Sequence, residues 1–209
     1  MILEMVQKSK DLFSAGFEII NAEREVGHVY LQGKLGSMEA QISGVFNNVT
    51  INMSYGNESD LELKITSRPY TIFISNLKDG VIYRARSKAS IFKQFDFQQM
   101  IFKNTVYNLY PISFGKDGGK SPIYCGNEQI AQVNKDCIVY NDLHDYHIYA
   151  KDDYAAKIAV IFCIYMYINA GYKPGEKVTK SVAKTYNKTT NKLLLAKYDP
   201  NFIHNITGI

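Results

Sequence analysis

The stretch DDYAAKIAVIFCIYMYINAGYKPG, residues 152–175, contains the longest apolar run of the chain and decides which folds are open to it. The apolar run covers residues 154–170 and is 17 residues long. A helix that crosses a membrane needs about 20 apolar residues, so this run lies at the short edge of that range. Lys157 interrupts its first turn and shortens the continuous apolar part further.

The residues around the run have the start and stop signals of a helix in a globular protein. Asp152 and Asp153 can cap its N-terminus, where a carboxylate also meets the positive end of the helix dipole. Gly171, followed by Pro174, is typical of a helix end. A helix that is apolar on every face must be buried on every face. We therefore predict a helix over residues 154–170 inside a protein core, with a single membrane span as the alternative.

Length and cysteine content set the remaining bounds. A chain of 209 residues suits one large domain or two small ones. Three cysteines cannot all pair, none forms a CxxC motif, and the first ten residues, MILEMVQKSK, contain no apolar leader. A cytoplasmic location is the expectation, with peripheral membrane association as a hypothesis.

Before residue 152 the chain alternates polar and apolar residues with frequent turn signals, as short antiparallel strands do. Asp79-Gly80 is the clearest hairpin signal. The first 14 residues are compatible with an amphipathic helix or with a strand. The expected strands cover residues 17–22, 27–32, 37–46, 49–55, 61–66, 70–75, 81–88, 90–97, 104–114, 123–126, 129–133, 137–140 and 146–150.

About a dozen strands and one apolar helix point to a closed barrel. A barrel of that size has a lumen that something must fill, and closure leaves no exposed strand edge. The predicted fold class is therefore mainly β: a closed antiparallel barrel of about 12 strands around a buried apolar helix, with a basic helical tail at the C-terminus. The barrel and its helix are expected over residues 1–171, and an extension packed on or beside it over residues 172–209.

The order of these elements resembles that of the tubby C-terminal-like superfamily, which includes phospholipid scramblases, LURP-one-related proteins and short bacterial relatives. FEIINAEREVGHVY (17–30) is read as strand, turn and strand, and IYCGNEQIAQVNKDCIVYNDLHDYHIYAKDD (123–153) as the paired strands before the final helix. The resemblance covers about residues 17–171 and rests on element order. It implies a buried helix and, as in the tubby branch, phosphoinositide headgroups as ligands of a basic pair on a strand. The residues after Gly171 depart from the family pattern.

The strand YRARSK places Arg84, Arg86 and Lys88 on one face, because side chains two apart in a strand share a face. Guanidinium groups bind phosphate oxygens through a planar fork. These three residues are the first candidate ligands of an anionic headgroup. The alternative is a solvated outer face of a strand whose Tyr83 and Ala85 point inward.

The C-terminal region carries the net charge. Residues 171–209 contain seven lysines and two acids, a balance of +5, so the preceding 170 residues carry −1 of the total of +4. A helix over residues 177–197 would align its lysines in one stripe that could contact an anionic membrane, although its Thr and Asn content lowers helix propensity. The alternative is a surface helix with a solvated lysine face. The candidate headgroup ligands in this region are Lys177, Lys180, Lys184, Lys188 and Lys192.

Other motifs carry weaker signals. NDLHDYHIY brings together Asp142, His144, Asp145 and His147, but the two histidines point to opposite faces of a strand, so surface and turn residues are expected rather than a metal site. FGKDGGK (114–120) lacks the phosphate-loop pattern and is expected to be a flexible hairpin loop. Cys163 lies in the apolar helix without an adjacent base. The cysteines Cys125 and Cys137 are expected in the core.

The sequence contains no catalytic signature and no recognisable nucleic-acid module. The leading hypothesis is a non-enzymatic binding or adaptor module that recognises anionic phospholipid headgroups, with no cofactor and with a membrane surface or a protein as partner. The alternatives are an enzyme that acts on a small molecule in an unseen cleft, and a structural protein-interaction module. The oligomeric state is left open.

Overall fold

The computed structural model describes residues 1–11, 14–33, 40–55, 69–87, 93–139, 143–169, 182–183 and 188–208. Within these ranges the chain is mainly β, as predicted. The strands are β1 (Ile2–Lys10), β2 (Ser14–Asn21), β3 (Arg24–Gly33), β4 (Ala40–Phe46), β5 (Val49–Tyr55), β6 (Tyr70–Ile74), β7 (Leu77–Arg86), β8 (Asp96–Phe102), β9 (Thr105–Leu109), β10 (Ile112–Ser113), β11 (Gly119–Cys125), β12 (Glu128–Lys135), β13 (Ile138–Val139), β14 (Asp145–Ala150) and β15 (Val182–Ala183). The helices are α1 (Asp153–Asn169), α2 (Lys192–Leu195) and α3 (Phe202–Thr207), with a 3₁₀ turn at Gly115–Asp117.

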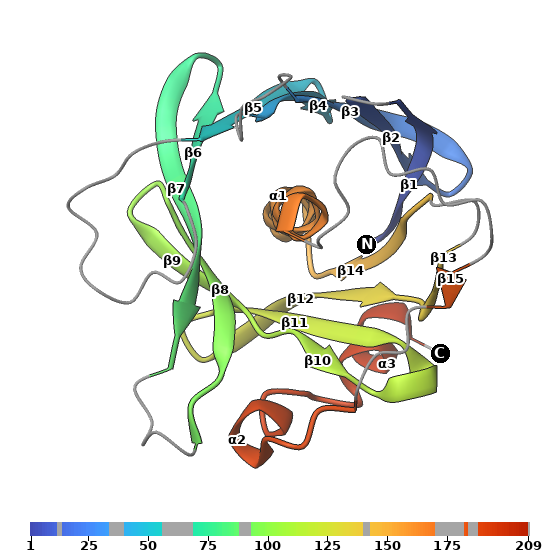
Figure 1. Ribbon diagram of the computed structural model, residues 1–209, viewed down its shortest axis with the longest axis vertical. Coiled ribbons are helices and arrows are strands. Elements are labelled where there is room, and N and C mark those ends of the chain that lie inside the picture. Colours follow the sequence, from blue (N-terminus) through green and yellow to red (C-terminus); the bar gives the residue numbers. More distant parts are fainter. Residues whose placement is uncertain are drawn as a thin grey trace.

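Twelve strands form a closed antiparallel barrel (Figure 1). Around the barrel the order is β11-β12-β14-β1-β2-β3-β4-β5-β6-β7-β8-β9, and the pairing of β9 with β11 closes the ring. β10 pairs with the same edge of β11 as β9 does and continues the line of β9 in the barrel wall. Closure pairs every strand of the ring on both sides, which removes the exposed edges of an open sheet. The predicted barrel is confirmed.

Helix α1 runs through the middle of the barrel, where Figure 1 shows it end-on within the ring of strands. Every residue from Ile158 to Tyr165 is 0 % exposed. The helix is 17 residues long, or about 25 Å at 1.5 Å per residue, and fills the lumen along its length. Asp152 accepts a hydrogen bond from the amide of Ala155 at 2.7 Å, so the expected N-terminal cap is formed. Among the described helices, α1 included, none has the length and apolar content needed to cross a membrane.

Several strand boundaries differ from those predicted. The first residues form β1. The hairpin expected around Asp79-Gly80 forms between β6 and β7, but its turn does not lie at these residues, because β7 begins at Leu77 and includes both. The turn lies at Ser75-Asn76, where both residues have positive φ (52° and 65°), as a two-residue hairpin turn requires.

The segments on either side of β9 also differ. The strand expected at residues 90–97 forms instead as β8, from Asp96 to Phe102. The strand expected at residues 104–114 divides at Pro111, whose nitrogen has no proton for a ladder hydrogen bond. The strand expected at residues 61–66 lies outside the described residues.

The barrel wall consists of three four-stranded units with the same local structure. The units are β1–β4, β5–β8, and β9 with β11, β12 and β14. In each unit a hairpin joins the second and third strands, and a β-bulge lies near the start of the third strand. The carbonyl of the bulged residue accepts a hydrogen bond from the amide of the residue that follows the fourth strand. The three bonds run from Asn47 N to Val26 O (3.0 Å), from Lys103 N to Asp79 O (2.8 Å) and from Lys151 N to Ile130 O (3.0 Å).

The residue after each bulge faces a buried residue at the end of the fourth strand. The facing pairs are Gly27–Phe46, Gly80–Phe102 and Ala131–Ala150. In the first two units glycine permits a close backbone approach, because a Cβ at either position would clash with the carbonyl oxygen of Val45 or Ile101. The third unit places small residues on both strands. Three copies of this four-stranded unit make up the twelve strands of the ring.

The C-terminal residues lie against the outside of the barrel. Thr189 and Ser113 exchange two hydrogen bonds, 2.8 and 2.9 Å long, and the Tyr124 hydroxyl donates to the carbonyl of Lys197 at 2.9 Å. Leu194 of α2 packs with Tyr110 and Ile112 in an aromatic-rich cluster on this outer face. The described tail is helical only in α2 and α3.

The continuous helix considered for residues 177–197 is not formed. Val182–Ala183 is a strand that pairs with β13, and Asn191 caps the N-terminus of the short helix α2. The lysine stripe that depended on this helix is therefore absent from the described residues of that range.

Candidate binding site at one end of the barrel

Arg84 and Arg86 lie on the interior face of β7. They alternate with Tyr83 and Ala85, which belong to a separate cluster on the outer face, whereas Ile82 belongs to the core around α1. Because side chains two apart share a face, both arginines continue the interior face beyond Ile82 to the end of the barrel. The alternative with Tyr83 and Ala85 pointing inward is therefore wrong, and the arginines lie at the mouth of the barrel.

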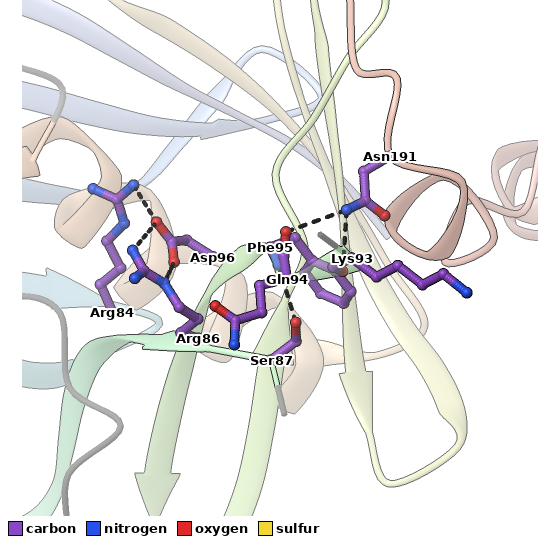
Figure 2. A network of polar contacts seen from close by, with 8 residues as sticks. All are labelled: Arg84, Arg86, Ser87, Lys93, Gln94, Phe95, Asp96 and Asn191. Carbon is purple, nitrogen blue, oxygen red and sulfur yellow. Dashed lines mark hydrogen bonds and ion pairs between the residues drawn. The ribbon is translucent and has the colours of Figure 1, made fainter. Parts of the chain in front are cut away.

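A carboxylate on the neighbouring strand joins the two arginines. Asp96 of β8 faces Arg86 across the ladder, and Figure 2 shows both guanidinium groups directed at it. Arg84 Nη2 lies 2.8 Å from Asp96 Oδ2, and Arg86 Nε lies 2.8 Å from Oδ1. The hydrogen bond from Arg86 lowers the pKa of Asp96, and the charges of both arginines act in the same direction against partial burial. Two cations around one carboxylate leave a local charge of +1.

A cavity of about 430 Å³ opens beside this cluster, at the end of the barrel where α1 finishes. Its walls come from six strands and from the last turn of α1. The lining residues are Arg84, Asp96, Phe97, Gln98, Pro111, Ile112, Ser113, Gly119, Ser121, Lys135, Tyr146, Tyr165, Met166 and Asn169. Among these described residues the charged ones are Arg84, Lys135 and Asp96, which sum to +1. Volumes of this size are typical of small-molecule sites.

Lys135 is a second cation at this mouth. It continues the interior face of β12 after Ala131 and Val133, and its ammonium group lies 4.7 Å from the ring centre of Tyr146. The negative end of the α1 dipole also lies here, and it favours nearby cations. The site therefore combines positive charge with the apolar surface of α1.

The predicted lysines divide into two groups. Lys188 and Lys192 are exposed and flank the mouth, because their neighbours Thr189 and Asn191 are bonded to its rim. Thr189 bonds to the cavity residue Ser113, and Asn191 donates to the carbonyls of Lys93 and Gln94, next to Asp96 in sequence (Figure 2). The remaining candidates, Lys88, Lys177, Lys180 and Lys184, lie outside the described residues.

The metal-like motif does not form a centre in the described part of the chain. His144, expected on the surface, is 0 % exposed and packs edge-on against Tyr167 at 5.3 Å. His147 lies 3.6 Å from Glu4 on the barrel exterior. No group of three or more His, Cys, Asp or Glu residues converges among the described residues, and Asp142 lies outside them.

The remaining motifs have structural roles. Cys163 is fully buried in α1, where burial raises the pKa of its thiol. Cys125 is partly buried and packs against the core, close to what was expected. Cys137 is partly buried and belongs to no core cluster of the described residues, so the core position expected for it is wrong. The loop expected at residues 114–120 is shorter than predicted, because β11 begins at Gly119.

Sequence reasoning missed most of the cavity. Three of its polar residues continue the apolar interior face of a strand by one or two alternate positions: Asp96, Gln98 and Lys135. The alternation of side chains along a strand is therefore the signal that could have identified them. Tyr165 and Met166 lie in a run that the sequence marks only as an apolar helix. Their contribution depends on the depth of the helix in the barrel, which the sequence does not encode locally.

Comparison with known proteins adds no further assignment, because no family model, no curated protein and no solved structure matches the chain. The class of the protein is therefore defined by its architecture alone: a closed twelve-stranded antiparallel barrel around a central helix, with a cation-lined cavity at one mouth.

Proposed function

We propose that the protein is a non-enzymatic binding module that recognises anionic phospholipid headgroups at the barrel mouth. The observation that carries this proposal is that Arg84 of β7 and Lys135 of β12 line one cavity. Guanidinium and ammonium groups are the side chains that bind phosphate oxygens most strongly. The exposed Lys188 and Lys192 beside the same mouth extend the positive surface.

The resemblance to the tubby C-terminal-like superfamily points to the same ligand class. It implies headgroup binding by a basic pair on a strand, and Arg84 and Arg86 are the corresponding pair. A protein with this activity would work at the cytoplasmic surface of a membrane and would approach it with the end of the barrel at which α1 finishes.

Acid–base catalysis at this cluster is less favoured. A general acid or base works best when its pKa lies near the working pH. The arginines lower the pKa of Asp96, so this carboxyl group stays ionised near neutral pH and accepts hydrogen bonds instead of exchanging protons. The position of Asp96 between two arginines therefore supports electrostatic binding of an anion at this cluster more than proton transfer.

Co-sedimentation with vesicles tests the proposal. Purified protein is mixed with anionic vesicles (phosphatidylcholine with phosphatidylserine) or with neutral phosphatidylcholine vesicles, across a salt series. Binding to the anionic vesicles alone, weakened by salt, is expected, because exposed charges are screened within about 8 Å at physiological ionic strength. The variant Arg84→Ala/Lys135→Ala should lose most of this binding.

Arg24→Ala/Lys103→Ala is the matched control, because it also removes two positive charges. Lys103 is exposed and follows Phe102 of β8, which pairs with Gly80 at the opposite end of the barrel. Arg24 is exposed and lies at the start of β3, next to the turn at residues 22–23 and therefore at the opposite end of the barrel. Equal losses in both variants would indicate a response to net charge alone and would reject the cavity mouth as the site. Absence of binding at the lowest salt would reject lipid recognition and favour a protein partner.

A further inference from the structure

We infer that the cavity binds a single-chain glycerophospholipid, with its phosphate at Arg84 and Lys135, its glycerol hydroxyl at Gln98 and its one acyl chain along α1. This inference rests on the proposed function and deepens it by naming the ligand class. It follows from the division of the cavity into a charged rim and an apolar floor.

The floor is formed by α1 and the neighbouring strands. Tyr146 and Tyr165 are 1 % and 0 % exposed, and Met166 packs partly buried against the same core. Ile112 closes the wall on the β10 side. Tyr146, Tyr165 and Ile112 are nearly fully buried beneath this floor. The carbon surface accessible in the cavity comes from Met166, Phe97 and Pro111, and it would be energetically costly to hydrate. An apolar group of the ligand is the partner that such a floor selects.

The volume limits how much of a chain can enter. At about 30 Å³ for each water-sized group, a cavity of about 430 Å³ holds roughly 14 such groups. The glycerophosphate head has about ten non-hydrogen atoms and takes up most of this number, so the cavity holds the head and only the first few carbons of one chain. The two acyl chains of a membrane phospholipid together exceed it, so the cavity selects a ligand with one chain.

Gln98 supplies the third recognition element. It faces Arg84 directly across the β7–β8 ladder, and both residues line the cavity. Its Oε1 atom is buried and has no hydrogen-bond partner among the described atoms. A buried acceptor of this kind needs a donor. The free hydroxyl of a monoacyl glycerophosphate is such a donor, and it lies close to the phosphate group of the same molecule. This arrangement matches the neighbouring positions of Gln98 and Arg84.

Calorimetric titration with monoacyl glycerophosphates of increasing chain length tests the inference, with glycerol phosphate as the probe without a chain. Each buried methylene group should raise affinity about fourfold until the cavity is full, after which affinity should level off. Alkyl phosphates, which lack the hydroxyl, should bind about fivefold more weakly than chain-matched glycerophosphates. Gln98→Leu should abolish that preference.

Met166→Gln tests the floor, because it replaces an apolar side chain with a polar one of similar length. It should lower affinity for the chain-bearing probes more than affinity for glycerol phosphate. Leu77→Gln is the control, since Leu77 is 69 % exposed and follows the hairpin turn at the opposite end of the barrel.

Two results would overturn the inference and leave the proposed function intact: chain-bearing probes that bind no more tightly than glycerol phosphate, or an affinity that keeps rising with chain length without levelling off. The second result indicates adsorption to an outer surface. If neither glycerol phosphate nor any chain-bearing probe binds, the inference and the proposed function both fail.

Discussion

The side-chain amide of Gln7 donates a hydrogen bond to the hydroxyl of Tyr167, which lies 160 residues away in the sequence, at 3.0 Å. Gln7 belongs to the barrel wall and Tyr167 to the central helix, and each is 1 % exposed. The carbonyl oxygen of the same Gln7 side chain accepts from the amide of His144 at 3.0 Å. One buried carboxamide thus ties the helix to two segments of the wall and fixes its depth beside the cavity.

Tyr167→Phe removes the hydroxyl acceptor and leaves the Gln7 amide with a weaker contact to the Ser9 carbonyl at 3.3 Å. We expect a loss of about 1–3 kcal/mol in the free energy of unfolding, because a buried donor loses its partner. Denaturant titration measures this change. Tyr30→Phe is the matched control, since Tyr30 is 57 % exposed, and it should change stability by less than about 0.5 kcal/mol. Equal effects would contradict the anchoring role.

Ile161→Asp places a carboxylate in the middle of α1, at a position that is 0 % exposed. An unpaired buried charge costs several kcal/mol, which is comparable with the whole stability of a domain. We expect no soluble folded protein on expression. Leu77→Asp, at an exposed position, should fold normally. Cooperative unfolding of soluble Ile161→Asp protein would contradict the buried position of the helix.

Gly27→Ala and Gly80→Ala test the repeated bulge structure. An added Cβ at either position meets a backbone carbonyl of the neighbouring strand, which cannot move without disturbing the ladder. Each substitution should lower the free energy of unfolding by about 1–3 kcal/mol, and the two losses should be similar. Gly119→Ala is the control, because its Cβ would approach no atom closer than 3.9 Å. A stable Gly80→Ala protein would show that the close approach is not required.

Asp96→Asn should strengthen anion binding. The Asp96 carboxylate accepts hydrogen bonds from both arginines and therefore competes with a phosphate for them. Its removal should raise affinity for anionic vesicles about twofold to fivefold, the range expected for a partly exposed ion pair. Glu18→Gln removes the same charge from the Glu18–Lys8 pair on the outer wall, so it controls for net charge. Equal gains in both variants would contradict competition at the site.

The pH dependence of stability follows from the same pair. Since the arginines lower the pKa of Asp96 in the folded protein, its ionised form favours folding at pH values above about 4, the unfolded value. That contribution is lost as the pH falls through the lowered pKa. The unfolding free energy of Asp96→Asn, measured across the acid range, should therefore fall less steeply than that of the wild type. Parallel curves would contradict a stabilising role for the ion pair.

The sequence predicted the main architecture because the decisive signals are local. The apolar run and Asp152 mark the central helix, and the polar–apolar alternation marks the strands. The orientation of Arg84 could not be predicted in this way. Residues 81–85 of β7 place apolar side chains on both faces, so the alternation shows which residues share a face but not which face is interior.

The ion pair between Arg86 and Asp96 could not be predicted either, because it depends on strand register, which is set by the whole β7–β8 pair.

The position of the turn after β6 was also not predictable from the local signal Asp79-Gly80. These residues form the bulge and close-approach positions of a repeated unit, and the turn itself uses the weaker signal Ser75-Asn76. The repeat is difficult to read from the sequence because two of its three units have glycine at the close-approach position and the third has alanine.

The most direct test of the account uses the four arginines of the chain as spectroscopic probes. Nitrogen-15 spectra of the guanidinium Nε–H groups are recorded while glycerol phosphate is added, with signals assigned from single Arg→Lys variants. The account predicts that the Arg84 signal shifts and saturates and that the Arg24 signal, from the opposite end of the barrel, does not move. A shift of similar size at both residues, or no shift at Arg84, would contradict anion binding at the barrel mouth.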